Sequence, residues 1–241
     1  MSKRTWIIFA IIVIGLLTGM VVSSRNGRTQ IDVSSVDANT VQQASKANGN
    51  IADHVFGKSD SKVVLIEYGD FQCPACGKSF PGINTITEEY KATITYIFRN
   101  FPLPASTHPN ALAAAATVES AGLQGKYWEM YDLVYENQQQ WSNLTGAART
   151  DMFISYANRL GLNETKFKTD LSDPAITQKI AFDRAIGDKL GINSTPTFFL
   201  NGVKLDSDTV SDVQNSNGDK LRALIDSDLK KAGITPPSIV K

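Results

Sequence analysis

Cysteine and histidine are scarce in this sequence, and their scarcity limits the chemistry that it supports. The 241 residues contain two cysteines, Cys73 and Cys76, and two histidines, His54 and His108. A structural zinc site takes four ligands, commonly two C-x-x-C pairs, or one pair with two closely spaced histidines. The two histidines here lie far apart in the chain. We therefore predict no metal site.

The chain also lacks an excess of charge of either sign. Its 24 Lys and Arg residues balance 24 Asp and Glu residues. No basic cluster is present that would attract a polyanion, so we expect no nucleic-acid partner. The sequence has no phosphate-binding glycine loop and no nucleophilic serine motif. These absences leave the two cysteines as the main candidates for chemistry.

A single long hydrophobic run stands near the N-terminus. Lys3 and Arg4 precede residues 6–22, WIIFAIIVIGLLTGMVV, which contain no charged residue. A helix of this length spans about 25 Å, slightly less than the hydrocarbon core of a bilayer. We predict a transmembrane anchor in the lipid bilayer, with residues 1–5 in the cytoplasm and the remainder outside the cell membrane. The alternative is a signal segment cleaved at Val22-Ser23-Ser24, which also exports the domain.

The next segment is polar and precedes the predicted domain. Residues 23–50 are rich in Ser, Asn, Gln and Gly and almost free of aromatic residues. Such a composition is typical of a flexible linker. We therefore expect the folded domain to occupy residues 51–241.

The domain begins with a strand, a helix and a second strand. Residues 62–70, KVVLIEYGD, and 93–101, TITYIFRNF, are rich in β-branched and aromatic residues, which predicts strands. The predicted helix between them begins near Pro74, contains Pro81 and ends near Tyr90. This order predicts a parallel βαβ unit.

A helical block follows, and strands return near the C-terminus. The pattern predicts helices within about residues 105–185. In residues 195–205, TPTFFLNGVKL, Asn201-Gly202 is a typical turn of a β-hairpin, and residues 218–233 predict a closing amphipathic helix. The fold class is therefore α/β with an inserted all-helical subdomain.

The two cysteines stand at the start of the predicted helix, as Cys73-Pro74-Ala75-Cys76. A disulfide that closes so small a ring restricts the unfolded chain little, which disfavours a purely structural role. At a helix N-terminus, unpaired N–H groups and the helix dipole favour an anion and lower the pKa of Cys73. Cys76 lies one turn later and is placed to resolve a mixed disulfide. We predict a redox-active pair that needs no other cofactor.

A second motif, Thr195-Pro196, comes directly before a predicted strand. Proline is incompatible with the interior of a strand ladder. Most X–Pro bonds are trans, but this position favours a cis bond. We expect the backbone of Thr195 to form an edge that pairs with a substrate peptide.

Together, IEYGDFQCPACGKSFP, the helical block and STPTFFLNG resemble the thioredoxin-fold thiol–disulfide oxidoreductases of the DsbA type, especially their membrane-anchored, Gram-positive-like members. The resemblance covers about residues 51–233. It implies that Cys73 is the attacking cysteine, that Cys76 is the resolving cysteine and that Pro196 is a cis-proline facing them. It also implies exported proteins with cysteines as substrates, and a quinone-linked membrane partner that reoxidises the pair.

Glu67 interrupts the first predicted strand, six residues before Cys73. This is an unfavourable place for an unpaired carboxylate. The pattern alone leaves open an exposed charge at the strand end. The resemblance implies instead a buried acid with a raised pKa that relays a proton for the resolving cysteine. Asp70 is expected in a solvated turn, and His108 as a helix cap or a surface residue.

Ala75 is the position at which the sequence departs from the family. Strongly oxidising members carry a histidine before the second cysteine, and its charge stabilises the thiolate. Dithiol pairs range from about −270 mV to about −120 mV, so this position bears on the direction of electron flow. We predict an oxidase that donates the Cys73–Cys76 disulfide. The alternatives are a reductase or isomerase of the same fold, and a non-catalytic, membrane-tethered binding module whose cysteines act only as a staple.

Overall fold

The computed structural model describes Trp6, Val13, Gly15 and residues 31–238. The compact domain starts at Val33. The predicted membrane segment, residues 6–22, lies almost entirely outside the described residues, as do residues 1–5, so the anchor stays a prediction. Among the described residues, no helix has both the length and the apolar character that crossing a membrane requires.

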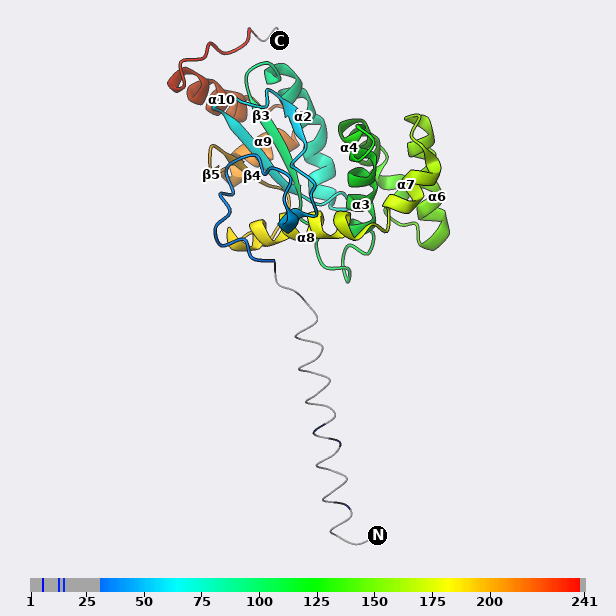
Figure 1. Cartoon of the computed structure of the whole chain (residues 1–241). Helices are drawn as coiled ribbons and strands as arrows, with labels where there is room; N and C mark the ends of the chain where they lie inside the picture. Colours follow the sequence, from blue (N-terminus) through cyan, green and yellow to red (C-terminus); the bar gives the residue numbers. More distant parts are fainter. Residues whose placement is uncertain (1–5, 7–12, 14, 16–30, 239–241) are drawn as a thin grey trace. The chain divides into compact units, whose positions relative to one another are not determined.

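A five-stranded sheet forms the centre of the described domain (Figure 1). The strands pair in the order β1 (Val55–Gly57), β3 (Thr95–Asn100), β2 (Val64–Gly69), β4 (Thr197–Leu200) and β5 (Val203–Lys204). β2 and β3 are parallel, and the other neighbouring pairs are antiparallel. Because α2 (Pro74–Tyr90) connects β2 to β3, the predicted βαβ unit is confirmed. The predicted hairpin is confirmed as well, with Asn201 and Gly202 both at positive φ.

Helices cover both faces of the sheet, which explains why β2 and β3 read as continuous apolar runs. Side chains alternate along a strand, so Leu65 and Glu67 share one face while Tyr68 points to the other. Leu65 belongs to a core formed with α2 and α10 (Asp219–Lys231). The opposite face packs against α8 (Pro174–Lys189).

The predicted helical insertion is confirmed between β3 and β4. Its elements are α3 (Ala111–Gly122), α4 (Tyr127–Glu136), α5 (Gln138–Trp141), α6 (Gly146–Arg159), α7 (Glu164–Asp170) and α8. The insertion shares one apolar core with the first turns of α2, because Phe71 and Phe80 pack among the aromatic rings of α4. The short elements β1 and α9 (Ser207–Gln214) had no counterpart in the sequence predictions.

The prediction of a flexible linker over residues 23–50 is wrong for residues 33–50. The ammonium of Lys189 donates hydrogen bonds to three carbonyl oxygens in this segment, those of Val33, Ser34 and Val36, at 2.8–3.0 Å. A short 3₁₀ helix, η1 (Lys46–Asn48), packs against α8. The polar segment is held because its backbone carbonyls are acceptors for side chains of the domain, which composition alone does not reveal.

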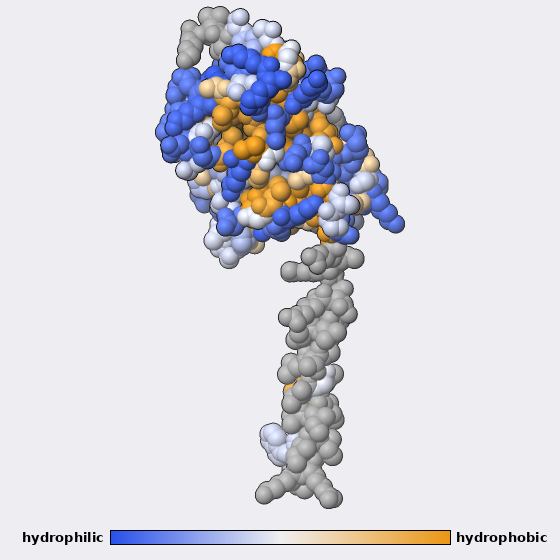
Figure 2. All heavy atoms as spheres, turned by 90° about the vertical axis from the view of Figure 1, so that its left-hand side faces the viewer, coloured by the Kyte–Doolittle hydropathy of each residue, from blue (hydrophilic) through white to orange (hydrophobic). Residues whose placement is uncertain are grey.

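The sheet ends at β5, a short strand whose two residues are exposed. Val203 is 69% exposed. Figure 2 looks at the side of the molecule on which β5 and α10 lie in Figure 1, and it shows apolar residues gathered within a hydrophilic border. So short an edge strand, which also carries Lys204, limits pairing with another sheet.

Candidate active site

The chain turns from β2 directly into α2, and this turn places Cys73 at the N-terminus of the helix. Cys73 is the N-cap residue, with extended backbone angles, and Pro74 is the first helical residue. The Cys73 amide donates to the carbonyl of Asp70 at 3.0 Å. Both cysteines are free thiols and are buried, with Cys73 6% and Cys76 1% exposed. The predicted position of the pair at a helix N-terminus is confirmed.

The two thiols differ sharply in acidity. A hydrogen bond from the Cys76 thiol lowers the pKa of Cys73 to about 5 against the effect of burial, with further contributions from Thr195 and from the backbone amides of Cys76 and Ala75. Burial raises the pKa of Cys76 well above its usual value, and the hydrogen bond to Cys73 and the charge of Glu67 raise it further. At neutral pH the pair is therefore one thiolate and one thiol.

The loop before β4 completes the surroundings of Cys73. The Thr195–Pro196 bond is cis, as expected. The carbonyl oxygen of Thr195 lies 3.4 Å from the sulfur of Cys73, although the two residues are far apart in sequence. Thr195 is buried, and its hydroxyl has no hydrogen-bond partner among the described residues. The two predicted motifs therefore meet at one sulfur atom.

Glu67 lies inside the protein beneath this pair. It is 2% exposed, so an exposed charge at the strand end is excluded. Burial raises the pKa of Glu67 to about 8, and the charge of Cys73 adds to this rise. The Tyr96 hydroxyl opposes it by donating to Oε2 of Glu67 at 2.6 Å. The side chain is therefore a carboxylic acid at neutral pH, as the resemblance implied.

The prediction of a solvated Asp70 is wrong, while His108 is half-buried at the edge of a surface hollow, where it contacts Asp70. Asp70 is 2% exposed, and its carboxylate accepts hydrogen bonds from the amides of Gln72 (2.8 Å) and Leu103 (2.9 Å). Nδ1 of His108 lies 2.7 Å from Oδ2 of Asp70. The carboxylate is buried because it accepts hydrogen bonds from backbone amides of two segments, the turn between β2 and α2 and the segment after β3. An Asp that accepts a hydrogen bond from the backbone amide two residues later forms an Asx-turn, which is a common local pattern. This pattern could have indicated the contact of Asp70 with Gln72, but not those with Leu103 and His108.

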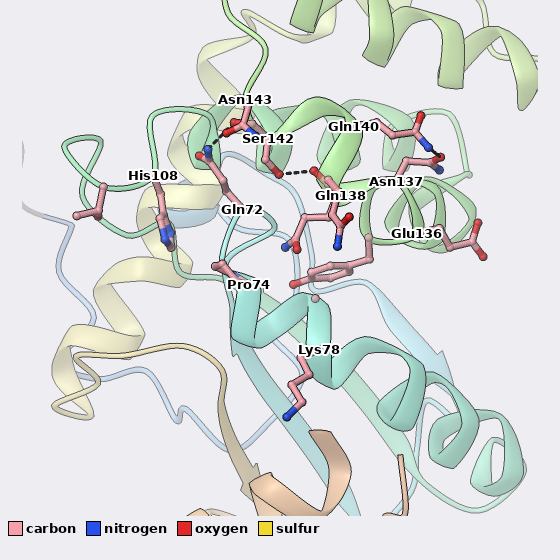
Figure 3. Close-up of a pocket in the computed structure, with 14 residues that line it drawn as sticks. Gln72, Pro74, Lys78, His108, Glu136, Asn137, Gln138, Gln140, Ser142 and Asn143 are labelled. Atoms are coloured by element: carbon pink, nitrogen blue, oxygen red, sulfur yellow. Dashed lines mark hydrogen bonds between the residues drawn. The ribbon is translucent and has the colours of Figure 1, made fainter. Parts of the chain in front are cut away.

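A hollow of about 1090 Å³, lined mainly by polar side chains, adjoins Pro74 (Figure 3). Gln138 forms part of its wall and donates through Nε2 to the carbonyls of Phe71 (2.7 Å) and Cys73 (2.9 Å). In Figure 3 the labelled amide side chains lie on one side of the first turn of α2, while Lys78 extends to the other. Sequence reasoning missed Gln138, because nothing in the run of three glutamines distinguishes it.

A second hollow, of about 560 Å³, adjoins Pro196. Its walls include Phe198, Leu205 and Val210, so it is more apolar than the first. Among the residues that the structure describes, no group of three His, Cys, Asp or Glu side chains converges as metal ligands would. The absence of a metal site stays a prediction, based on the scarcity of cysteine and histidine.

Comparison with known proteins agrees with this geometry. The thioredoxin family model matches residues 49–226. The chain belongs to the thioredoxin family.

Solved structures with a similar fold include proteins of the DsbA type. α-DsbA1 of Wolbachia pipientis is 25% identical, with a TM-score of 0.62 over 75% of this chain and 92% of that one. Oxidised BdbD of Bacillus subtilis, at 20% identity, has a TM-score of 0.62 over 79% and 98% of the two chains. MdbA of Corynebacterium diphtheriae, a thiol-disulfide oxidoreductase, has a TM-score of 0.55 at 18% identity, over 77% and 98%. The resemblance to DsbA-type proteins and the thioredoxin-like fold with a helical insertion are confirmed.

Part of the chain is also similar to much longer proteins named as transporters. The Na(+)/H(+) antiporter NhaA 1 of Salinispora arenicola is 38% identical over 150 residues, which are 62% of this chain and 22% of the antiporter. The protein of the same name from Mycolicibacterium vanbaalenii is 34% identical over 156 residues, or 63% and 24%. The chain thus spans less than a quarter of the length of these two relatives.

Proposed function

We propose that this thiol–disulfide oxidoreductase of the DsbA type donates its Cys73–Cys76 disulfide to thiols of exported proteins. The observation that carries the proposal is the placement of Cys73 at the N-terminus of α2, with its sulfur 3.4 Å from the Thr195 carbonyl and Cys76 buried one turn later. This placement lowers the pKa of Cys73 to about 5 and raises that of Cys76. A pair whose reduced form is stabilised as a thiolate gives up its disulfide readily.

The reaction follows from the positions of the two sulfurs. A substrate thiolate attacks the sulfur of Cys73, the bond to Cys76 breaks, and a mixed disulfide forms between substrate and Cys73. Cys76 leaves with the electron pair and takes a proton from the carboxylic acid of Glu67. A second substrate thiolate then attacks the substrate sulfur of the mixed disulfide and releases Cys73 as a thiolate. Two electrons pass from the substrate to the cysteine pair.

The substrate polypeptide lies against the loop that carries Thr195 and Pro196. The Thr195 carbonyl, 3.4 Å from the attacked sulfur, is positioned to accept a hydrogen bond from an extended substrate backbone. The hollows beside Pro74 and Pro196 offer room for the substrate on either side of its cysteine. Each turnover leaves the pair reduced, so a quinone-linked membrane protein restores the disulfide. The segment 6–22 anchors the domain outside the cell membrane.

The equilibrium potential against glutathione tests the direction of electron flow. Stabilisation of the Cys73 thiolate predicts a value nearer about −120 mV than about −270 mV. A value near the lower limit overturns the oxidase and supports a reductase or isomerase of the same fold, since Ala75 supplies no cation.

Trapping of intermediates tests whether the pair is catalytic. Cys76→Ala removes the resolving thiol, so mixed disulfides between Cys73 and exported proteins should accumulate, whereas a Cys73→Ala, Cys76→Ala variant should show none. If the single variant traps nothing in that compartment, the cysteines act only as a staple and the chain is a binding module.

A further inference from the structure

We propose that Glu67 exchanges its proton with solvent through the hydroxyl groups of Tyr96 and Tyr131, which lead to a small cavity beside Asp132. This inference rests on the proposed function, because it supplies the proton that Cys76 takes up when the disulfide opens. Tyr96 and Tyr131 are positioning residues for that proton and do not contact substrate.

The two hydroxyls and the carboxyl group form a continuous chain of hydrogen bonds. The Tyr96 hydroxyl lies 2.6 Å from Oε2 of Glu67 and 3.2 Å from the Tyr131 hydroxyl. The three side chains are 2%, 2% and 3% exposed for Glu67, Tyr96 and Tyr131. Tyr96 comes from β3 and Tyr131 from α4, so this series of hydrogen bonds connects the sheet to the helical insertion.

The chain of hydroxyls ends at a cavity. Tyr96 and Tyr131 both line a cavity of about 30 Å³, whose walls also include Asp132 and Glu88. That volume suffices for about one water molecule, and the lining residues carry hydroxyl and carboxylate groups of the kind that a buried water needs as partners. Glu88 is exposed, so the cavity borders solvent. Glu67 itself is not among the lining residues, and the hydrogen bonds through Tyr96 and Tyr131 connect it to them.

The acidic residues at the cavity suit proton exchange near neutral pH. Burial and the neighbouring carboxylates Glu136, Glu129 and Glu88 raise the pKa of Asp132 to about 6. A group with such a pKa both holds and releases a proton in this range.

Each proton transfer leaves both tyrosines neutral. When Glu67 is ionised, Tyr96 donates to it and Tyr131 donates to Tyr96. A proton from water at the cavity then passes to the Tyr131 oxygen, the proton of Tyr131 passes to Tyr96, and that of Tyr96 passes to Glu67. The net change is one proton moved from the cavity to the carboxylate, and reoxidation of the cysteine pair runs the sequence backwards. Burial raises the pKa of both tyrosines well above the usual value, so neither needs to ionise.

Among the described residues, the titratable groups that act on Glu67 include no cation. The titratable side chains that act on it come from α2, β3 and α4: Cys73, Cys76, Tyr96, Tyr131 and Tyr135. From β4, the residue opposite Glu67 is Phe198, which is apolar. A substrate disulfide-bonded to Cys73 covers the cysteine side, which leaves the tyrosine chain as the path to solvent.

The chain offers a matched control in Tyr127, one turn before Tyr131 on α4. Tyr127 is 4% exposed, and its hydroxyl has no hydrogen-bond partner among the described residues. Tyr131→Phe and Tyr127→Phe therefore each remove one buried hydroxyl from the same helix, and only the first interrupts the proposed path. Tyr96→Phe interrupts it at a second point.

The test is stopped-flow reduction of the oxidised full-length protein by a dithiol peptide in H₂O and in D₂O, with thermal unfolding recorded for every variant. We expect Tyr131→Phe and Tyr96→Phe to slow the reaction by about tenfold, a fraction of the usual gain from acid–base catalysis. Their solvent isotope effect should exceed that of the wild type, whereas Tyr127→Phe should match the wild type in both readouts.

The outcomes separate this inference from the proposed function. A wild type that exchanges thiols normally, with Tyr131→Phe and Tyr127→Phe indistinguishable in rate and isotope effect, overturns the proton path alone. A slower Tyr131→Phe without a larger isotope effect also overturns it, because loss of packing explains that result. A wild type with no exchange activity overturns the proposed function itself.

Discussion

Two carboxyl groups, Glu67 and Asp53, are buried on opposite faces of the central sheet, and their pKa values are shifted in opposite directions. On the face covered by α2, Glu67 has a tyrosine hydroxyl as its partner, and its pKa rises to about 8. On the face covered by α8, Asp53 contacts Arg99 at 2.8 Å and Lys179 at 2.7 Å. These two cations hold the pKa of Asp53 at about 2 despite its burial.

The alternation of side chains along β3 determines whether a buried carboxyl group contacts a tyrosine or an arginine of this strand. Tyr96 and Arg99 are three residues apart on this strand and therefore point to opposite faces. Asp53, with two cations beside it, keeps a fixed charge and holds together the segment before β1, β3 and α8. A buried carboxyl group without a cation exchanges a proton instead. The fold thus separates a structural cluster from a reactive one.

Removing a cation from the face of the sheet covered by α8 should cause the largest change, a loss of stability. Lys179 is 1% exposed and also contacts Asp183 at 2.6 Å. Lys179→Met leaves two buried carboxyl groups without this partner and should lower the free energy of unfolding by about 3–5 kcal/mol, measured by urea denaturation. Lys126→Met, which breaks an exposed pair with Glu129, should cost less than about 1 kcal/mol. Equal costs for the two variants contradict the fixed-charge interpretation.

Removing the acid from the α2 face should change the rate more than the stability. Glu67→Gln keeps the shape of the side chain but cannot supply a proton to Cys76. We expect reduction of the disulfide to slow by about 100-fold, the lower range of acid–base catalysis. Single-turnover kinetics at pH 7 provide the measurement, with Glu164→Gln, whose side chain is 43% exposed on α7, as the control. A variant as fast as the wild type removes Glu67 from the mechanism.

The two carboxyl groups should also give opposite pH dependences of stability. The folded protein keeps the proton of Glu67 up to about pH 8, whereas an ordinary glutamate releases it near 4.5. Stability from this group is therefore complete below pH 4.5 and falls as pH rises to 8, by up to about 1.4 kcal/mol per unit. For Asp53 the pKa falls from 3.8 to about 2, so its contribution is complete above pH 3.8 and is lost as pH falls to 2.

The difference in unfolding free energy between wild type and Glu67→Gln isolates the first of these dependences. It should decline between pH 4.5 and 8 and then level off. A difference that stays constant over this range shows that Glu67 does not hold its proton in the folded protein.

Adding a cation beside the cysteine pair, at the start of α2, should cause the smallest change, a shift in the pKa of Cys73. Ala75→His places a positive charge next to the cysteine pair and should lower the pKa of Cys73 further, by about one unit or less. The ultraviolet absorbance of the thiolate, followed against pH, measures this change, and the potential should become more oxidising. Ala75→Gln serves as the uncharged control, and an equal shift in both variants argues against a charge effect.

Local patterns in the sequence predicted the reactive pair and its supporting elements. The βαβ unit, the position of Cys73 at the helix N-terminus and the hairpin at Asn201 each depend on a few neighbouring residues, and all three are confirmed. The burial of Glu67 was different. The pattern of apolar residues around Glu67 was also compatible with an exposed charge at the strand end, and only the resemblance to a family indicated a buried acid.

Partners that come together across the fold could not be predicted. Asp70 and His108 are 38 residues apart, Tyr96 and Tyr131 are 35 apart, and each pair meets only when the helical insertion or the segment leading to it packs on the sheet. Residues 33–50 were misjudged for a related reason. Their polar composition indicates solvation, whereas their carbonyl oxygens are acceptors for Arg99 and Lys189.

The two hydrogen bonds of Gln138 limit which helical insertions from related proteins could replace the one in this chain. One amide group of α5 holds the carbonyls of Phe71 and Cys73, and thus the backbone that carries the attacking sulfur. The helical insertion is for this reason not an interchangeable module attached to a self-sufficient catalytic half. A chimera that receives a foreign insertion needs a donor at the place of Gln138, or the sulfur will lose its alignment.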